Sequence, residues 1–270
     1  MDTGTEVEIG FFEGSNMMKF SIITVSFNSV ATIETTLSSV AEQTHTAIEH
    51  IVIDGGSTDG TLEIIYRRRS GLAHVITGPD NGIYDAMNKG IALASGDIIG
   101  ILNADDFYAD RNVIAQIAGA FEDESVDACY GDLEYVDSFL TGKVVRYWRS
   151  GNYRPERFYH GWMPPHPTFF ARRTLYEEYG GFNLELGSSA DYELMLRFLL
   201  KHGATAVYIP AVLVRMRIGG VSNATLSNRL RANRMDRLAW RVNGLHPKPW
   251  TMYMKPLAKL NQFICRRAQP

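Results

Sequence analysis

Two adjacent carboxylates and an amide follow an apolar segment in the first half of the chain. Residues 102–106 read Leu-Asn-Ala-Asp-Asp and come directly after the segment 96–101, which is apolar except at Asp97. In an open α/β sheet, ligands bind beyond the carboxyl ends of the strands. Carboxylates at such a position suit Mg²⁺ or Mn²⁺, which bind through one or two carboxylates plus substrate phosphates. The segment therefore predicts a divalent-metal site, and the alternative is an Asp-rich turn.

A second acidic segment stands later in the chain. Residues 187–194 read Gly-Ser-Ser-Ala-Asp-Tyr-Glu-Leu and open a helical pattern that continues to residue 200. Asp191 lies near the start of that helix, where a carboxylate can take a proton from an attacking hydroxyl group. The alternative is a carboxylate that only stabilises the helix through its dipole.

Residues 82–90, Gly-Ile-Tyr-Asp-Ala-Met-Asn-Lys-Gly, form a third candidate segment at the start of a predicted helix. Free backbone N–H groups at a helix N-terminus favour anions. Asp85 and Asn88 are expected to face hydroxyl or phosphate groups of a ligand. Lys89 is expected on the surface.

The elements that carry these segments alternate between strand and helix. The apolar runs predict strands at 20–27, 48–54, 73–77 and 97–102, with helices at 30–41, 60–69 and 83–94. This alternation predicts an α/β fold, a mostly parallel sheet with helices on both faces. After Gly131 the pattern changes to antiparallel strands at 133–136 and 143–148 and to helices at 175–179 and 192–201.

The composition is that of an ordinary soluble globular protein, with 270 residues, 45% hydrophobic and 21% charged. No apolar run is long enough to span a bilayer, and no signal peptide precedes the first strand. Two cysteines, Cys129 and Cys265, argue against a disulfide framework or a cysteine metal site and fit a reducing, cytoplasmic compartment.

Charge is distributed unevenly along the chain. The segment 224–270 holds ten basic residues against the single acid Asp236, a charge of +9 in a chain whose net charge is −3. A basic helical tail on an acidic body predicts an anionic partner, and we expect the inner face of the cell membrane, with peripheral attachment, rather than nucleic acid. In the segment 249–267 the apolar residues fall mostly on one side of a helix, as an interfacial helix requires. The alternative is that these apolar residues pack on the main domain or across a homodimer.

Neither common nucleotide-binding fingerprint is present after the first strand, which lacks both G-x-G-x-x-G and the P-loop lysine motif. Instead, four segments occur in order: Ile-Thr-Val-Ser-Phe-Asn at 23–28, Ile-Val-Ile-Asp-Gly-Gly-Ser-Thr-Asp-Gly-Thr at 51–61, residues 82–90, and residues 102–106. This series resembles family 2 glycosyltransferases with the GT-A fold over residues 19–222. The sequence of residues 82–90 is similar to that of bacterial exopolysaccharide and colanic-acid-type transferases.

The resemblance implies a Rossmann-like GT-A domain at 18–222, with a nucleotide-sugar half at 18–106 and an acceptor half at 107–222. An acidic, flexible extension at 1–17 is expected to precede it, and the basic helical tail at 223–270 to follow it.

The resemblance also assigns donor-binding roles in the first half. Asp54 matches the carboxylate that hydrogen-bonds the uracil of a UDP-sugar, although it is also placed to cap the Gly55–Gly56 turn. Asn103, Ala104 and Asp105 match the D-x-D motif that holds ribose and metal. In this chain Asn103 replaces the first acid, so it is expected to bind ribose rather than metal. The remaining donor-side residues implied are Val25, Phe27, Asn28, Asp85 and Asn88, and the metal is assigned to Asp105 with support from Asp106.

In the second half, Asp191 matches the catalytic base. The segment 162–170 resembles the loop and strand that precede the base, where Trp162 would stack on an acceptor sugar and His166 would reach the diphosphate or the metal. Residues 217–222 are expected to form a flexible loop that closes over the donor.

Together these features predict an inverting glycosyltransferase that uses Mg²⁺ or Mn²⁺ and a nucleotide-sugar, with a preference for UDP. The expected acceptor is a saccharide or lipid-linked oligosaccharide in cell-surface polysaccharide synthesis. Two alternatives stay open. A nucleotidyltransferase would carry a basic loop after the first strand, which residues 26–31 lack, and a nucleic-acid-binding protein would not need the acidic segments.

Overall fold

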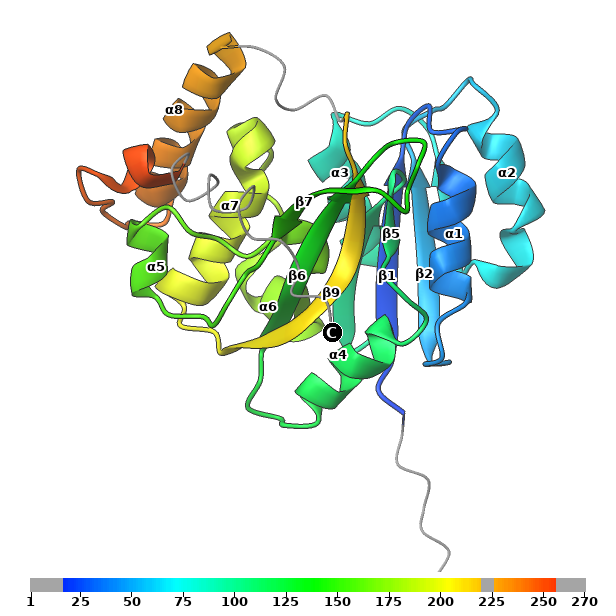
Figure 1. Ribbon diagram of the computed structural model, residues 1–270, viewed down its shortest axis with the longest axis horizontal. Coiled ribbons are helices and arrows are strands. Elements are labelled where there is room, and N and C mark those ends of the chain that lie inside the picture. Colours follow the sequence, from blue (N-terminus) through cyan, green and yellow to red (C-terminus); the bar gives the residue numbers. More distant parts are fainter. Residues whose placement is uncertain (1–16, 220–225, 256–270) are drawn as a thin grey trace, which may run out of the picture.

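A single mixed sheet organises the chain. The structure, a computed structural model, describes residues 17–219 and 226–255, and within them nine strands form one sheet in the order β3-β2-β1-β4-β8-β6-β9-β5, with β7 paired to β6 (Figure 1). The first four strands are β1 (Phe20–Ser26), β2 (Ile48–Asp54), β3 (His74–Thr77) and β4 (Ile98–Asn103). Their three pairings are parallel, as predicted. All their carboxyl ends therefore lie at one edge.

The second half of the sheet turns mostly antiparallel. It contains β5 (Asp106–Tyr108), β6 (Ala128–Val136), β7 (Val144–Trp148), β8 (Phe170–Arg172) and β9 (Ala206–Arg217). The pairs β4–β8, β5–β9, β6–β7 and β6–β8 are antiparallel, and only β6–β9 is parallel. The sheet is thus mixed, and its parallel part is the half that was predicted from strand–helix alternation.

Helices cover both faces of the sheet. They are α1 (Ile33–Ala41), α2 (Thr61–Arg67), α3 (Ile83–Leu93), α4 (Val113–Phe121), α5 (Glu156–Tyr159), α6 (Arg173–Tyr179), α7 (Ala190–Met195) and α8 (Leu226–Val242). Short 3₁₀ turns occur at η1 (Arg69–Gly71), η2 (His166–Thr168) and η3 (Leu184–Ser189), and α7 continues into the π-helical turn η4 (Leu196–Lys201).

Alternating side chains of β1 separate the two layers of the core. Ile23 and Val25 pack with α3 and α7 in one hydrophobic cluster, whereas Phe20 and Ile22 pack with α4 on the other face. A Cβ at Gly90 would lie 2.3 Å from Cγ2 of Ile23, so only glycine lets α3 approach β1 this closely. This contact fixes the height of α3 against the sheet.

The basic segment begins with α8, which packs against the domain. Trp240 is fully buried, and its indole N–H donates to the Tyr192 hydroxyl of α7 at 3.0 Å. Trp240 therefore packs on the domain and takes no part in an exposed surface. Residues 1–16, 220–225 and 256–270 lie outside the described residues, and with them most of the expected N-terminal extension, residues 220–222 of the expected loop, and the distal part of the tail. Within the described ranges, no helix combines the length and apolar character needed to cross a bilayer.

Candidate active site

The acidic pair at the end of β4 divides into one buried and one accessible carboxyl group. Asp106 is 0% exposed, and the Asn103 side-chain amide donates to its Oδ2 at 3.3 Å. Burial, and next the charge of Asp105, raise the pKa of Asp106 well above its ordinary value. Burial thus disfavours a charge on Asp106, and Asp105, which is half-buried, is the carboxylate that can meet a ligand.

Arg217, the last residue of β9, supports the acidic loop from behind. Its Nη1 donates to the backbone carbonyl of Asp105 at 2.8 Å, and its guanidinium lies 4.9 Å from the centre of the Phe107 ring. Burial lowers the pKa of Arg217, while the charges of Asp105 and Asp106 raise it. Sequence reasoning placed Arg217 in a flexible loop, but it is the buried end of a strand. No motif marked it, because the strand pairing that brings it to Asp105 is not visible in the sequence.

The charges of both acidic segments act on His166. It lies in η2, and within the described residues its buried Nε2 has no hydrogen-bond partner. Burial lowers the pKa of His166, whereas the charges of Asp191 and Asp105 act to raise it. The imidazole thus has an unused ring nitrogen, and its pKa responds to both carboxylates that the sequence marked.

Asp191 stands in the first turn of α7, and its carboxylate acts on the Tyr84 phenol of α3. Oδ1 of Asp191 accepts the Tyr192 N–H at 2.8 Å. The pKa of Tyr84 is raised by burial first and by the Asp191 charge second, so the phenol keeps its proton. Tyr84 packs 5.2 Å from Phe182 between ring centres. Tyr84 was missed as a site residue, although it belongs to the segment 82–90 that the sequence singled out.

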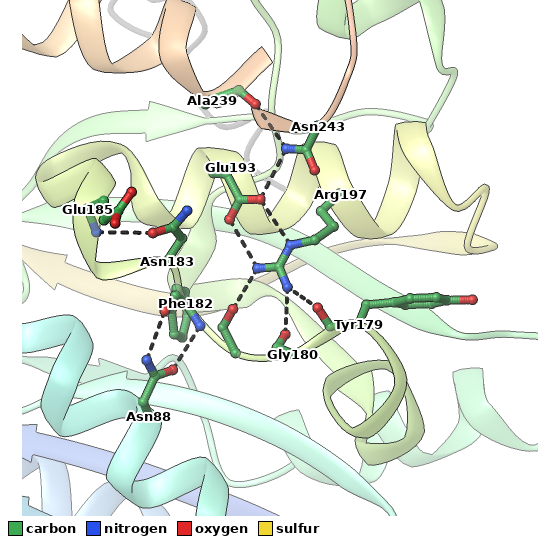
Figure 2. A network of polar contacts seen from close by, with 11 residues as sticks. Asn88, Tyr179, Gly180, Phe182, Asn183, Glu185, Glu193, Arg197, Ala239 and Asn243 are labelled. Carbon is green, nitrogen blue, oxygen red and sulfur yellow. Dashed lines mark hydrogen bonds and ion pairs between the residues drawn. The ribbon is translucent and has the colours of Figure 1, made fainter. Parts of the chain in front are cut away.

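A buried polar network fixes α7 between α3 and α8 (Figure 2). The Glu193 carboxylate, 2% exposed, pairs with Arg197 at 2.9 Å and accepts from the amide of Asn243, the residue after α8, at 3.1 Å. Arg197 also donates to the carbonyls of Gly180 at 2.9 Å and Gly181 at 2.6 Å. A carboxylate and a guanidinium so well supplied with partners hold one geometry, and breaking such a pair is costly. The position of Asp191, two residues before Glu193, is set by this network.

Asn88 joins the same network rather than the ligand site. Its Nδ2 donates to the carbonyl of Phe182 at 2.8 Å, and its Oδ1 accepts the Phe182 N–H at 2.8 Å (Figure 2). Asp85 accepts the Asn81 N–H at 3.0 Å and pairs with Lys89 at 3.1 Å. Both side chains stabilise their own surroundings, so the structure does not place them facing a donor as the sequence led us to expect.

Asp54 and Asn28 shape the loops beyond β1 and β2. Oδ1 of Asp54 accepts from the hydroxyls of Ser26 and Ser57, and Oδ2 accepts from the N–H groups of Gly56 and Ser57 and the hydroxyl of Thr77. Asp54 is 1% exposed, and both oxygens of its carboxylate accept hydrogen bonds that stabilise this turn. This is the turn-capping alternative to a uracil contact. Asn28, at a φ of 49°, accepts the Thr58 N–H at 3.0 Å, and Val25 is buried in the core.

A more accessible carboxylate lies next to this turn. Phe27 is 64% exposed, and a Cβ at Gly55 would lie 3.4 Å from its ring and 2.6 Å from Oδ2 of Asp80. The absence of a side chain at Gly55 thus lets the Phe27 ring and the Asp80 carboxylate approach the same point. Oδ1 of Asp80 accepts the Gly82 N–H at 2.9 Å, which fixes the carboxylate in place. Sequence reasoning missed Asp80, since it follows a short strand and carries no motif of its own.

Trp162 was expected to stack on an acceptor sugar, and this expectation is wrong. The indole is 8% exposed and packs against Tyr130, Phe158 and Tyr153 at ring-centre distances of 5.7, 5.5 and 6.1 Å. Its N–H donates to the carbonyl of Ser150 at 2.9 Å. The tryptophan fills the core beneath the site because its bulk and its single donor are both satisfied there.

The donor set fits a cation that shares its coordination with a substrate. Within the described residues, no three His, Cys, Asp or Glu side chains gather to enclose a metal ion. Asp105 and the unpartnered Nε2 of His166 remain as protein ligands. Mg²⁺ binds in this way, through one or two protein groups completed by phosphate oxygens and water.

Comparison with known proteins assigns the chain to a class. The model of the family described as Glycosyl transferase family 2 matches residues 21–180. An uncharacterized glycosyltransferase of Mycobacterium tuberculosis strain H37Rv is 35% identical over 197 residues, 67% of this chain and 68% of that protein. A PGL/p-HBAD biosynthesis glycosyltransferase of Mycobacterium bovis strain BCG is 32% identical over 209 residues, 76% of this chain and 79% of that protein.

Solved structures share the fold. TarS 1-349 of S. aureus, in complex with UDP-GlcNAc, has a TM-score of 0.67 at 20% identity and covers 92% of this chain and 72% of its own. The mannosyltransferase PcManGT of Pyrobaculum calidifontis, in complex with GDP-Man and Mn²⁺, has a TM-score of 0.61 at 20% identity and covers 89% and 74%. The fold match extends beyond the residues that the family model covers.

Proposed function

This chain belongs to glycosyltransferase family 2 and is a glycosyltransferase with a GT-A fold, and we propose that it is an inverting, metal-dependent enzyme that uses a UDP-sugar. One observation carries the proposal. Asp105 from the donor half and Asp191 from the acceptor half both act on His166, whose Nε2 is unpartnered within the described residues. Membership of the family favours sugar transfer and argues against the nucleotidyltransferase and nucleic-acid-binding alternatives.

The donor base is proposed to lie over Gly55, against the exposed ring of Phe27. There Oδ2 of Asp80 can accept an N–H of the base, because the Asp54 carboxylate already accepts five hydrogen bonds. Asp54 would then contribute indirectly, by stabilising the Gly55–Gly56 turn beneath the base. The ribose is proposed to lie against Asn103 and Ala104 at the end of β4, where Oδ1 of Asn103 has no partner within the described residues.

Asp105 and His166 are proposed to hold Mg²⁺ or Mn²⁺ together with the diphosphate. A divalent cation bound there supplies charge stabilisation for the leaving UDP. Arg217 keeps Asp105 in place through its backbone carbonyl. Because Asp106 is fully buried, we propose that it shapes the loop and is not itself a ligand.

Asp191 is proposed as the general base. In an inverting transfer the acceptor hydroxyl attacks the anomeric carbon from the face opposite the leaving diphosphate, and a carboxylate takes its proton. In this proposal the Tyr84 phenol interacts with this carboxylate, and the Glu193–Arg197 network fixes the helix that carries it. We propose a saccharide or lipid-linked oligosaccharide as the acceptor, reached from an anionic membrane surface that attracts the basic tail.

Calorimetry with nucleotides tests the donor half of the proposal. UDP with Mn²⁺ should bind the wild-type chain more tightly than GDP, and the Asp105→Ala variant should lose the metal-dependent part of the affinity. Asp80→Asn should weaken UDP binding by about 10-fold, since the amide offers a donor where the carboxylate accepts. Equal affinity of folded wild-type and Asp105→Ala protein for UDP and Mn²⁺ would contradict the metal assignment. Glu63→Gln, on the exposed face of α2, is the matched control.

A further inference from the structure

An open pocket lies where α8 ends, on the side of the molecule away from α1 and α2 (Figure 1). Its volume is about 490 Å³. The lining combines four basic side chains with small and apolar residues: Arg237, Arg241, Gly244, Leu245, His246, Pro247, Lys248, Pro249 and Met252. No acidic side chain lines it, which favours an anionic ligand over a cationic one.

Within the described residues, no acidic side chain pairs with the cations of this pocket. Arg237 and Arg241 are both exposed and stand one helical turn apart, a like-charge arrangement that destabilises a helix on its own. The neighbouring acid, Asp236, faces away and pairs with Lys255 at 2.7 Å. Among residues 17–219 and 226–255, Arg237, Arg241 and Lys248 form no ion pair. An unopposed cluster of this kind indicates an anionic ligand from outside.

Aromatic side chains stand beside the cations. The Lys248 ammonium lies 5.5 Å from the Trp250 ring centre and 5.8 Å from that of Tyr159. Trp250 is 46% exposed and Tyr253 is 68% exposed, while Met252 between them is buried and anchors this turn to the domain. Exposed Trp and Tyr beside Lys and Arg are typical of protein surfaces at the headgroup level of a bilayer.

We propose that this pocket binds the phosphate of an anionic lipid headgroup, with Arg237, Arg241 and Lys248 as its ligands and Trp250 and Tyr253 entering the interface. The inference deepens the membrane part of the proposed function, because it names the surface that meets the lipid. It assigns the attraction to a defined site on the folded domain instead of to the charge of the whole tail. Because α8 packs on α7, the site belongs to the same rigid unit as Asp191.

Vesicle co-sedimentation of the full chain tests the pocket. The probes are phosphatidylcholine vesicles with and without phosphatidic acid, and inorganic phosphate serves as the soluble competitor. Binding is expected only with phosphatidic acid. The triple variant Arg237→Gln/Arg241→Gln/Lys248→Gln should bind about 100-fold more weakly, since each basic residue contributes about fivefold near an anionic surface. The control variant Arg67→Gln/Arg111→Gln/Lys201→Gln removes the same charge from exposed positions elsewhere and should bind like wild type.

The outcomes separate the pocket from the rest of the account. Equal loss of binding in the two triple variants would overturn the pocket and leave a diffuse charge effect. Binding to phosphatidylcholine vesicles that phosphatidic acid does not increase would also overturn it, because the ligand would then not be a lipid phosphate. UDP release without any vesicle binding would overturn the pocket while the transferase function stands. Trp250→Ala is expected to weaken binding about 10-fold without changing the unfolding transition, which excludes misfolding as the cause.

Discussion

Tyr84 and Asp191 come from opposite halves of the sequence, and the charge of the Asp191 carboxylate acts on the Tyr84 phenol, whose pKa burial and this charge both raise. Tyr84 belongs to the first turn of α3, which packs on the parallel strands, and Asp191 belongs to the first turn of α7. This pair therefore links the proposed base to the half of the fold that is expected to hold the donor. The position of Tyr84 depends on the tight contact of α3 with β1 at Gly90.

Replacing Tyr84 with Phe removes the phenol hydroxyl and keeps the ring that packs on Phe182. If the hydroxyl positions the base, the transfer rate should fall about 10-fold, the scale of losing one polar contact to a charged group, with donor affinity unchanged. Steady-state kinetics with varied donor separates the two quantities. Tyr66→Phe, at an exposed tyrosine of α2, is the control. An unchanged transfer rate in Tyr84→Phe would show that the Tyr84 hydroxyl does not position the base.

Replacing Asn88 with Ala distinguishes a structural role from donor binding. The substitution leaves the N–H and the carbonyl of Phe182 without their partner, so the free energy of unfolding should drop by about 2 kcal/mol. The KM for the donor should change less than twofold. Urea denaturation and donor titration give both values. A large rise in KM with unchanged stability would restore Asn88 to the donor site.

His50 makes the stability of the sheet depend on pH. Burial lowers the pKa of His50 from 6.5 to about 4, and Thr24 bonds its ring at 2.9 Å. The unfolded chain protonates this histidine near pH 6.5 while the folded chain does not, so stability is present at neutral pH and is lost as the pH falls from 6.5 toward 4. Each pH unit in that window should cost about 1.4 kcal/mol.

Urea unfolding at pH 7, 6, 5 and 4.5 measures this loss. The His50→Gln variant should show a shallower decline over the same range, because its amide does not titrate. His74→Gln, at an exposed histidine of β3, should decline like wild type. Parallel curves for wild type and His50→Gln would assign the acid sensitivity to another group, such as His166, whose pKa burial also lowers.

The parallel half of the fold was predictable because its strands are long, apolar and separated by helices. The structure confirms β1, β2, β3 and β4 close to the expected ranges. β9 was not predicted, since Pro210 interrupts it and its side chains are mostly half-buried, and β5 and β8 have three residues each, too few for a pattern. Pairings between distant strands decide the second half, and a single sequence does not contain them.

The candidate site was predictable at positions where local sequence sets the geometry. Asp105 follows a strand and Asp191 opens a helix, as the sequence led us to expect, and both remain proposed site residues. Arg217, Tyr84 and Asp80 were missed because their roles depend on contacts with residues far away in the chain. Trp162 and Asn88 were misplaced for the same reason: an aromatic ring or an amide in a promising segment can satisfy the core instead of a ligand.

The central claim is that Asp191 takes the proton in a metal-dependent sugar transfer from a UDP-sugar. The most direct test measures UDP release from a panel of UDP-sugars, with Mn²⁺ and a membrane lipid extract as the source of acceptor. Wild-type protein should release UDP, chelation should stop the release, and Asp191→Asn should slow it by about 100-fold or more while UDP affinity stays unchanged. UDP release by Asp191→Asn at the wild-type rate, or UDP release that continues unchanged in the presence of the chelator, would contradict the account.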